Sequence, residues 1–209
     1  MDNREKYYAL QEYLEDKSVA VIGSGASILK EEYGKDIDDH DVVVRINRGY
    51  PYEQYQKHVG SRTDIWSFGM ASDWKNKKKM HELFSDRKFS TYSWWDHNWI
   101  PDYVEKLDTH VTLPPVFSQT AAHYCKNKPL TTGGDMINFL LQGTSINKLS
   151  VYGVDFYSTG YWFIEEDSSH VPTVVSRKEG VVHDLYLEQK YLEQIVERSK
   201  EDIEVNWVK

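Results

Sequence analysis

The sequence predicts an α/β fold with a mostly parallel sheet of about six or seven strands and helices on both faces. Short apolar runs of strand length recur along the 209 residues. Segments with helical spacing separate these runs, which is typical of a parallel sheet covered on both faces. The first apolar run also ends in a glycine-rich turn that opens a helix. The length fits one domain over residues 1–209.

Each expected strand is an apolar run bounded by polar or turn residues. The strands are expected at residues 19–22, 42–46, 64–68, 89–93, 110–113, 149–154 and 203–205. The helices between them are expected at residues 26–33, 77–84, 117–126 and 134–141. A last helix is expected from Asp184, because Leu185, Leu192 and Ile195 fall near helical spacing with charged residues between them.

Two long segments, residues 48–60 and 158–180, show no firm periodicity. Loops of this length in a compact domain are usually functional lids or disordered segments. An aromatic cluster, formed by Trp94, Trp95, Trp99 and Pro101, follows the fourth expected strand. Because ligands of open parallel sheets bind beside the carboxyl ends of the strands, we expect substrate-binding side chains on these loops.

The composition narrows the class of protein. A net charge of −8 argues against a nucleic-acid partner, since such binders need a basic surface. The single cysteine, Cys125, excludes an internal disulfide and favours a reducing compartment. Residues 1–17 are polar, unlike a signal peptide, and no apolar run reaches the roughly 18 residues that span a bilayer. We therefore expect a cytoplasmic protein, with at most peripheral contact at the inner face of a membrane.

One basic run, Lys75 with Lys77, Lys78 and Lys79, departs from the acidic balance of the chain. It suits a solvated helix start or loop. A small anchor for anionic lipid or phosphate is the alternative.

The first expected strand ends in Gly23-Ser24-Gly25, followed by Ala26. Glycines let a backbone approach a phosphate, and a following helix start supplies N–H groups, so this turn indicates a nucleotide phosphate or sugar. A purely structural tight turn is the alternative. Ile28 replaces the third glycine of the dinucleotide fingerprint, and the second strand runs into Asn47 rather than an acidic residue, which disfavours NAD.

Three ordered motifs then carry a resemblance. After the glycine turn come Gly34, Ile37, Asp38, Asp41, Val43, Arg45 and Asn47, then Val59-Gly60-Ser61-Arg62-Thr63. Residues 129–133 are Pro-Leu-Thr-Thr-Gly, residues 149–156 end in Gly-Val-Asp-Phe, and His183 and Glu188 form a His-x-x-x-x-Glu pattern. These segments resemble the large (19–63), small (129–156) and very short (183–188) sialyl motifs of the animal-type sialyltransferases, glycosyltransferase family 29.

The resemblance implies a Rossmann-like fold of the GT-A variant type and an inverting, metal-independent transferase that needs no cofactor. It implies a CMP-activated nonulosonic (sialic) acid as donor and the hydroxyl of a glycan or glycolipid as acceptor. The implied catalytic residues are His183, as general base, and Glu188. The implied donor-binding residues are Gly23, Ser24, Gly25, Ala26, Asn47, Thr131, Thr132, Gly133, Gly153, Asp155, Tyr161 and His170. Acceptor contacts are expected around residues 94–99 and 157–170.

Several departures from the family pattern stand out. Ser24 takes the place of the usual asparagine, and one cysteine excludes the disulfide that joins the large and small motifs in the animal enzymes. Tyr161 and His170 both remain candidates for the phosphate contact, and neither has the usual distance to His183. A short chain without anchor or disulfide suggests a bacterial or viral member, acting in capsule or lipopolysaccharide biosynthesis.

The residues themselves suit this chemistry. An acceptor hydroxyl needs a base with a near-neutral pKa, which histidine supplies. His183 precedes the last expected helix, whose N-terminus disfavours the imidazolium; a helix-capping role is the alternative. Residues 131–133 precede another helix, which suits either an anionic donor group or a plain N-cap.

Two further charged groups are expected to be structural. Arg45 is expected to pair with Asp41 or Asp64 rather than to bind an anion. The run 38–41, Asp-Asp-His-Asp, is expected to be a loop and strand entry rather than a metal site.

Other functions remain open at this point. A transferase that uses CMP-Kdo is close, because that donor also carries CMP and a carboxylate at the anomeric carbon. A non-catalytic nucleotide-sugar binding domain is a second alternative, against which His183 argues. A Rossmann-like phosphotransferase is a third, against which the small motif argues. The acceptor, the linkage and the oligomeric state are not fixed by any motif.

Overall fold

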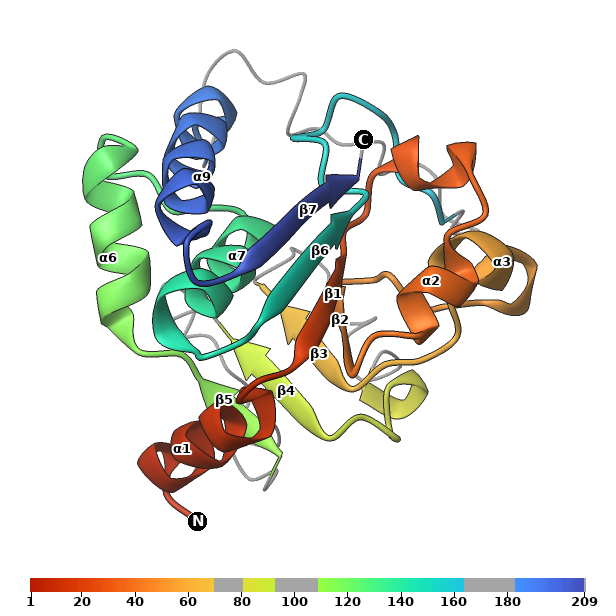
Figure 1. Ribbon diagram of the computed structural model, residues 1–209, viewed down its shortest axis with the longest axis horizontal. Coiled ribbons are helices and arrows are strands. Elements are labelled where there is room, and N and C mark those ends of the chain that lie inside the picture. The colour runs from red at the N-terminus through yellow and green to blue at the C-terminus, as the bar shows by residue number, and fades with distance from the viewer. Residues whose placement is uncertain (70–80, 93–108, 164–182, 209) are drawn as a thin grey trace.

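The computed structural model describes residues 1–69, 81–92, 109–163 and 183–208. These residues build one seven-stranded sheet in the order β5-β4-β3-β2-β1-β6-β7 (Figure 1). The strands are β1 (Ser18–Ile22), β2 (Val42–Ile46), β3 (Ile65–Phe68), β4 (Phe89–Tyr92), β5 (His110–Thr112), β6 (Lys148–Tyr152) and β7 (Glu204–Val208). Every pair of neighbouring strands is parallel. The predicted Rossmann-like α/β class is therefore confirmed, and the sheet is parallel throughout.

Helices cover both faces of this sheet (Figure 1). They are α1 (Asn3–Leu14), η1 (Ala26–Lys30), α2 (Gly34–Asp38), η2 (Glu53–Tyr55), α3 (Gln56–Val59), α6 (Pro115–Tyr124), α7 (Thr132–Gly143) and α9 (Leu185–Ser199). Strand β1 shows why both faces need cover. Val19 and Val21 lie in the core under α1, α6, α7 and α9, whereas Ala20 and Ile22 lie in the core under η1, α2 and α3. Alternate side chains of a buried strand thus supply two cores.

The expected elements lie close to the observed ones, with five corrections, one of which is the unexpected short helix α2. The helix expected at residues 26–33 is the short 3-10 helix η1, which ends at Lys30. Segment 48–60, expected to be irregular, contains η2 and α3. The last strand continues to Val208. Helix α1 was not expected, because residues 1–17 are largely polar.

Helix α1 has no broad apolar face, and its start is set by hydrogen bonds between neighbouring residues. Asp2 and Glu5 make a reciprocal capping box at its start. Lys6, Leu10 and Leu14 follow at intervals of four residues and are buried, which places one narrow face on the sheet. The Asn3 side chain exchanges hydrogen bonds with the backbone of Thr112 in β5 (3.0 and 2.8 Å), so the helix is fixed beside the edge strand.

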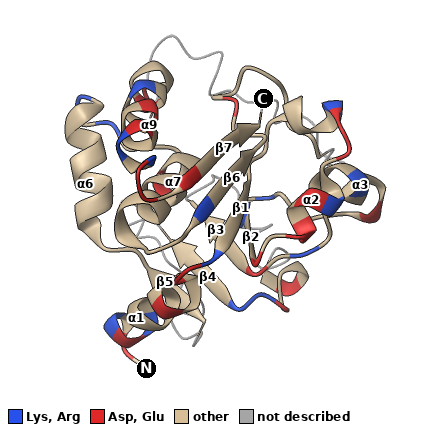
Figure 2. Cartoon of the chain, viewed as in Figure 1, with Lys and Arg blue, Asp and Glu red and all other residues tan. Residues whose placement is uncertain are grey.

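Several expectations fall outside the described residues. They are the aromatic cluster at residues 94–101, the basic run at 75–79, His170 and most of the helix at 77–84, of which residues 81–83 are seen and are helical. In the described parts, residues of both charge signs lie on α1, α2 and α9 (Figure 2). None of the described helices combines the length and apolar character that crossing a membrane requires.

Most of the large-motif side chains build the fold. The Asp38 carboxylate accepts hydrogen bonds from the backbone N–H groups of Ser61 and Arg62 (2.8–3.1 Å) and from the Ser61 hydroxyl. Gly60 lies at φ +70°, and a Cβ there would lie 2.5 Å from Asp38 Oδ1. The Val-Gly-Ser-Arg segment therefore needs its glycine to fold onto this aspartate.

The acidic run at 38–41 and Arg45 also make structural contacts. The Asp41 carboxylate accepts from the backbone N–H and hydroxyl of Ser18, while the His40 ring contacts the Asp36 carbonyl and the Ser150 hydroxyl. These side chains point to different partners, as expected for a loop and strand entry.

Arg45 is completely buried, but not in an ion pair. It donates to the carbonyl oxygens of Val59 and Arg62 and to the Thr63 hydroxyl. The prediction that it pairs with Asp41 or Asp64 is wrong: the ion pair to Asp64 comes from Arg62 (2.9 Å). Burial lowers the pKa of Arg45 to about 9.

Candidate active site

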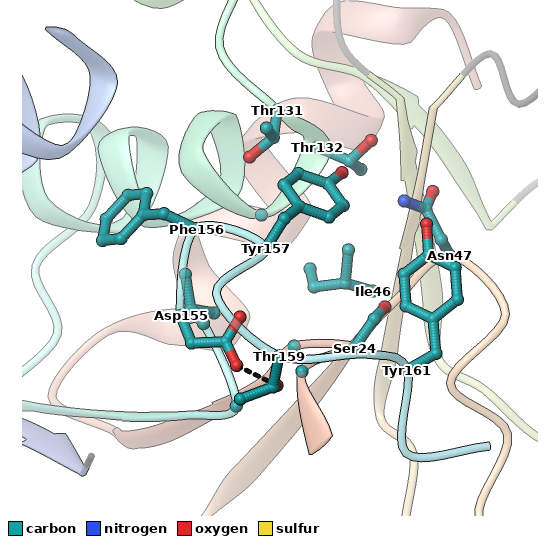
Figure 3. A pocket seen from close by; sticks show the side chains of 15 residues that line it. Ser24, Ile46, Asn47, Thr131, Thr132, Asp155, Phe156, Tyr157, Thr159 and Tyr161 are labelled. Carbon is teal, nitrogen blue, oxygen red and sulfur yellow. Dashed lines mark hydrogen bonds between the residues drawn. The ribbon is translucent and has the colours of Figure 1, made fainter. Parts of the chain in front are cut away.

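A pocket of about 60 Å³ lies at the carboxyl ends of β1, β2 and β6 (Figure 3). Strand β1 lies between β2 and β6, and the chain continues from β1 to β2 on one side and reaches β6 on the other side only later. This is the point where the strand order reverses, which is where open α/β sheets bind ligands. Four segments meet there: the turn after β1, the end of β2, the start of α7 and the loop after β6.

Most of the expected donor-binding residues line this pocket. They are Gly23, Ser24, Gly25, Asn47, Thr131, Thr132, Gly133, Gly153, Asp155 and Tyr161. Ala26 is absent from the lining. Ile46, Val154, Phe156, Tyr157 and Thr159 line it as well and were not expected as donor-binding residues. Val154 and Phe156 belong to the small motif, Ile46 lies between two residues of the large motif, and Tyr157 and Thr159 lie in the segment expected to contact the acceptor.

The N–H groups of Gly25 and Ala26, in the glycine turn, are paired within the protein. Gly25 N–H donates to the Gly153 carbonyl (2.8 Å), and Ala26 N–H donates to the Gly160 carbonyl (2.7 Å). The expectation that these two groups bind a phosphate is therefore wrong for this structure. The glycines serve close packing instead, because a Cβ on Gly25 would lie 2.4 Å from the Asp155 carboxylate.

Gly25→Ala is expected to disrupt the pocket. The added methyl group would overlap the Asp155 carboxylate, so the loop after β6 must shift. Gly160→Ala is the matched control, since a Cβ there meets nothing within 4 Å. We expect Gly25→Ala to lower the thermal midpoint by several degrees and to abolish nucleotide binding, measured by thermal unfolding and calorimetry. Equal behaviour of the two variants would contradict this role for Gly25.

The loop after β6 is fastened over the glycine turn. The Asp155 carboxylate accepts a hydrogen bond from the Thr159 hydroxyl (Figure 3), whose oxygen accepts from Ser27 N–H (3.2 Å). The Trp162 backbone N–H donates to the Ser24 carbonyl (3.1 Å), and its indole N–H donates to the Gly23 carbonyl (2.8 Å). Asp155 thus holds the loop that closes one side of the pocket.

Asn47 directs its side-chain amide into the pocket (Figure 3). Its Oδ1 accepts from Gly69 N–H (2.9 Å), and its backbone carbonyl accepts from the Trp66 indole N–H (2.6 Å). Because the oxygen is used, the Nδ2 hydrogens are the ones presented to the cavity. Asn47 lies at φ +52°, a conformation that asparagine adopts more readily than most residues. The hydroxyl of Ser24 points into the same space (Figure 3).

Thr131 and Glu188 tie the start of α7 to α9. Thr131 caps α7, since its hydroxyl oxygen accepts from Gly134 N–H (3.1 Å). The same residue donates twice to Glu188, from its hydroxyl (2.6 Å) and from its backbone N–H (2.9 Å). Glu188 is only 1% exposed and does not line the pocket. Burial raises the pKa of Glu188 to about 7, although both Thr131 hydrogen bonds oppose that shift.

His183 lies just before α9, as expected, and Asp184 is the N-cap residue. The Nδ1 atom of His183 is 2.9 Å from the Pro129 carbonyl oxygen. Since a carbonyl oxygen only accepts, Nδ1 carries the proton in this contact, and Nε2 of the neutral ring is then the basic atom. The contact fixes the imidazole to the segment that leads into Thr131 and Thr132. His183 is not among the residues that line the 60 Å³ cavity.

Comparisons with known proteins agree with this architecture. The model of glycosyltransferase family 29 (sialyltransferase) matches residues 10–200. A human CMP-N-acetylneuraminate-beta-1,4-galactoside alpha-2,3-sialyltransferase is 22% identical over 204 residues, which cover 84% of this chain and 54% of that protein. A beta-1,6-galactosyltransferase, GALT29A, from Arabidopsis thaliana is 42% identical over 48 residues, 23% of this chain and 12% of its own length. This chain thus spans about half the length of the human relative.

Solved structures show the same fold. The sialyltransferase CstII from Campylobacter jejuni, in complex with the substrate analogue cytidine-5'-monophosphate, superposes with a TM-score of 0.65. The match covers 92% of this chain and 80% of that one, at 16% sequence identity. Because the family model spans almost the whole chain, the protein belongs to glycosyltransferase family 29, the sialyltransferase family.

Proposed function

We propose that the protein transfers a nonulosonic acid from a CMP-activated donor to an acceptor hydroxyl, with inversion at the anomeric carbon and without a metal. One observation carries this proposal. In a chain of the sialyltransferase family, residues from the large and small motifs meet in a single pocket at the strand-order switch. That location suits a nucleotide.

The donor phosphate is assigned to hydrogen-bond donors. The Asn47 amide and the Ser24 hydroxyl face the pocket from one side, and the Thr132 hydroxyl faces it from the start of α7 (Figure 3). A helix of twelve residues such as α7 adds a favourable dipole for an anion at its N-terminus. Donors placed in advance around a leaving phosphate stabilise the charge that develops on it, which is the task a metal performs in other transferases.

Asn47→Asp tests the role of Asn47 in donor binding without removing its contact in the fold. Aspartate keeps the acceptor for Gly69 N–H and tolerates the positive φ, but it replaces the amide hydrogens with negative charge. We expect the thermal midpoint to stay within a few degrees and the affinity for CMP to fall by roughly tenfold or more, the cost of losing one charge-assisted hydrogen bond. Calorimetry with CMP measures this. Unchanged affinity would remove Asn47 from the donor site.

His183 is proposed as the general base. With Nδ1–H held by the Pro129 carbonyl, Nε2 takes the proton of the acceptor hydroxyl while that oxygen attacks the anomeric carbon. The bond between the anomeric carbon and the phosphate oxygen breaks, and CMP leaves with the electron pair. One displacement of this kind inverts the configuration. The Pro129 carbonyl that holds the His183 ring lies two residues before Thr131. The same backbone segment therefore positions both the base and the donor-binding residues at the start of α7.

Glu188, expected to be catalytic, is reassigned as a positioning residue. Its carboxyl group is buried against Thr131, and a Cβ on Gly134 would lie 2.4 Å from its Oε1. The very short motif therefore combines two functions in one segment: a base at the surface of the site, and an anchor that orients the start of α7.

CMP release tests the proposed function. Purified protein is incubated with CMP-Neu5Ac or CMP-Kdo, in EDTA, with and without galactoside acceptors. UDP-galactose, from which UDP release is followed, is included because the Arabidopsis relative is named as a galactosyltransferase. Release of CMP from CMP-Neu5Ac supports the proposal, and preference for CMP-Kdo supports the closest alternative. CMP binding without turnover of any donor would indicate a nucleotide-sugar binding domain.

A further inference from the structure

A second groove lies at the opposite end of the sheet from the donor pocket. Its lining includes Glu15, which precedes β1, and Ser145, which precedes β6, so it opens at the amino ends of these strands. Helix α1, helix α6 and the end of α7 surround it (Figure 1). It measures about 610 Å³, within the range of about 300–1,000 Å³ that is typical of small-molecule sites. The proposed transfer reaction makes no use of this groove.

Aromatic side chains from two helices form the apolar walls of this groove. Tyr7 and Tyr8 come from α1, and Phe117 comes from α6. The centroids of the two tyrosine rings are 5.9 Å apart and their planes are tilted by 55°, so together they form an angled surface. The buried Phe139 ring packs against both Tyr7 (6.1 Å between centroids) and Phe117 (5.6 Å). The core of the domain therefore holds both walls in place.

The polar side chains of the groove offer mainly hydrogen-bond acceptors. The Gln11 Nε2 group donates to the Gly143 carbonyl (2.7 Å), which ties α1 to the end of α7 and leaves Oε1 as an acceptor. The Thr144 hydroxyl donates to the carbonyl four residues earlier (2.6 Å), so its lone pairs remain. Glu12 and Glu15 add two carboxylates. None of the described lining residues is lysine, arginine or histidine. A ligand must therefore supply hydrogen-bond donors and carry no negative charge.

Two classes of ligand meet this description, a cation and an uncharged sugar. Glu12 and Glu15 are exposed, so water and salt screen their charge, and an ion pair there contributes little. Burial of apolar area against aromatic rings is not screened in this way. A sugar ring brings C–H groups that lie on an aromatic face and hydroxyls that donate to carboxylate and amide oxygens. The walls and the acceptors together thus favour the sugar.

We propose that this groove is a second binding site, specific for an uncharged glycan. One face of a sugar ring lies on Tyr7 and Tyr8, and its hydroxyls donate to Gln11, Glu12 and Glu15. The site does not depend on the proposed transfer reaction, because the donor pocket lies at the carboxyl ends of the same strands.

Saturation-transfer NMR with four neutral disaccharides, lactose, maltose, cellobiose and chitobiose, tests this site. We expect at least one of them to bind the wild-type protein, with a dissociation constant obtained by titration. Tyr8→Ala should weaken that binding by about tenfold, the effect of removing a central aromatic anchor. Tyr186→Ala is the matched control, since Tyr186 is 69% exposed, against 53% for Tyr8, and lies on α9 outside the groove. Thermal unfolding confirms that each variant is folded.

The double variant Glu12→Gln/Glu15→Gln distinguishes a sugar from a cation. Glutamine keeps an acceptor oxygen and removes the charge, so disaccharide binding should persist within roughly fivefold. Spermidine serves as the cationic probe. Spermidine binding that disappears in the double variant, without disaccharide binding, would assign the groove to a cation and overturn the proposal.

Two further results would contradict the glycan site. One is the absence of binding of all four disaccharides, and the other is equal binding by the wild type and Tyr8→Ala, which would place the sugar elsewhere on the protein. CMP release should be the same in Tyr8→Ala and the wild type, because the two sites lie at opposite ends of the sheet. A loss of CMP release in this variant would contradict their separation.

Discussion

His183→Ala is expected to lower kcat by about 10²–10⁴, the usual contribution of a general base. The structure provides the reason. The Pro129 carbonyl fixes the tautomer in which Nε2 is basic, and alanine removes this basic atom. Affinity for CMP should change little, because His183 is outside the cavity that the donor-site side chains line. The effect should therefore appear in kcat rather than in donor binding.

The measurement is CMP release at saturating donor and acceptor, together with calorimetric affinity for CMP. His58→Ala is the matched control. The Nδ1 atom of His58 contacts a backbone carbonyl in the same manner, 2.6 Å from Glu31 O, but this residue lies on α3. Full activity in His183→Ala would contradict the assignment of the base and leave the family assignment intact. Loss of CMP affinity in step with kcat would instead indicate that His183 supports the donor site.

The strands could be predicted because buried strand positions accept few residue types other than apolar ones. Val42 to Ile46 is buried at every position, so its sequence is apolar except for Arg45, and the strand pairs with a parallel strand on each side. Such runs are visible in a single sequence. Helix α1 was not visible, since its stability comes from a capping box and from a buried face of three residues that include a lysine. Local hydrogen bonding, rather than an apolar stripe, determines where it begins.

The pocket residues followed from the motifs, but the physical role of each did not. The glycines of the first turn were expected to admit a phosphate, and they admit Asp155 and Gly153 instead. That role depends on a loop more than a hundred residues away in the chain. The same holds for Phe156, whose ring stacks on Trp207, near the end of the chain. A local sequence pattern does not show contacts between distant segments. Motif spacing therefore predicted which residues line the pocket, but not which contacts each of them makes.

Glu188→Ala is expected to produce the largest loss of stability. The substitution leaves the hydroxyl and backbone N–H of Thr131 without their acceptor, at a half-buried helix start. An unsatisfied buried donor costs about 1–3 kcal/mol, so we expect a loss of roughly 2–4 kcal/mol in the free energy of unfolding. For a domain of this size, that lowers Tm by about 5–15 °C. Glu193→Ala is the control on the same helix, because its carboxylate is exposed and pairs with Lys190.

The pH dependence of stability distinguishes a buried carboxyl group from a surface one. The pKa of Glu188 is about 7 in the folded protein, against 4.5 for the free side chain. A raised pKa means that the folded state holds this proton more tightly. The stabilisation is therefore complete below about pH 4.5 and is lost as the pH rises to about 7. Glu188→Gln, which keeps an acceptor for Thr131, should abolish this part of the pH dependence.

Urea unfolding at several pH values tests that prediction, with Glu193→Gln as the control expected to leave the pH profile unchanged. An identical profile in wild type and Glu188→Gln would show that Glu188 does not change its protonation state in this range. If the profile flattens in Glu188→Gln, and kcat and CMP affinity both fall, the spacing between His183 and Glu188 has a structural explanation. The helix start that receives the donor would then be held by the same turn of α9 that presents the base.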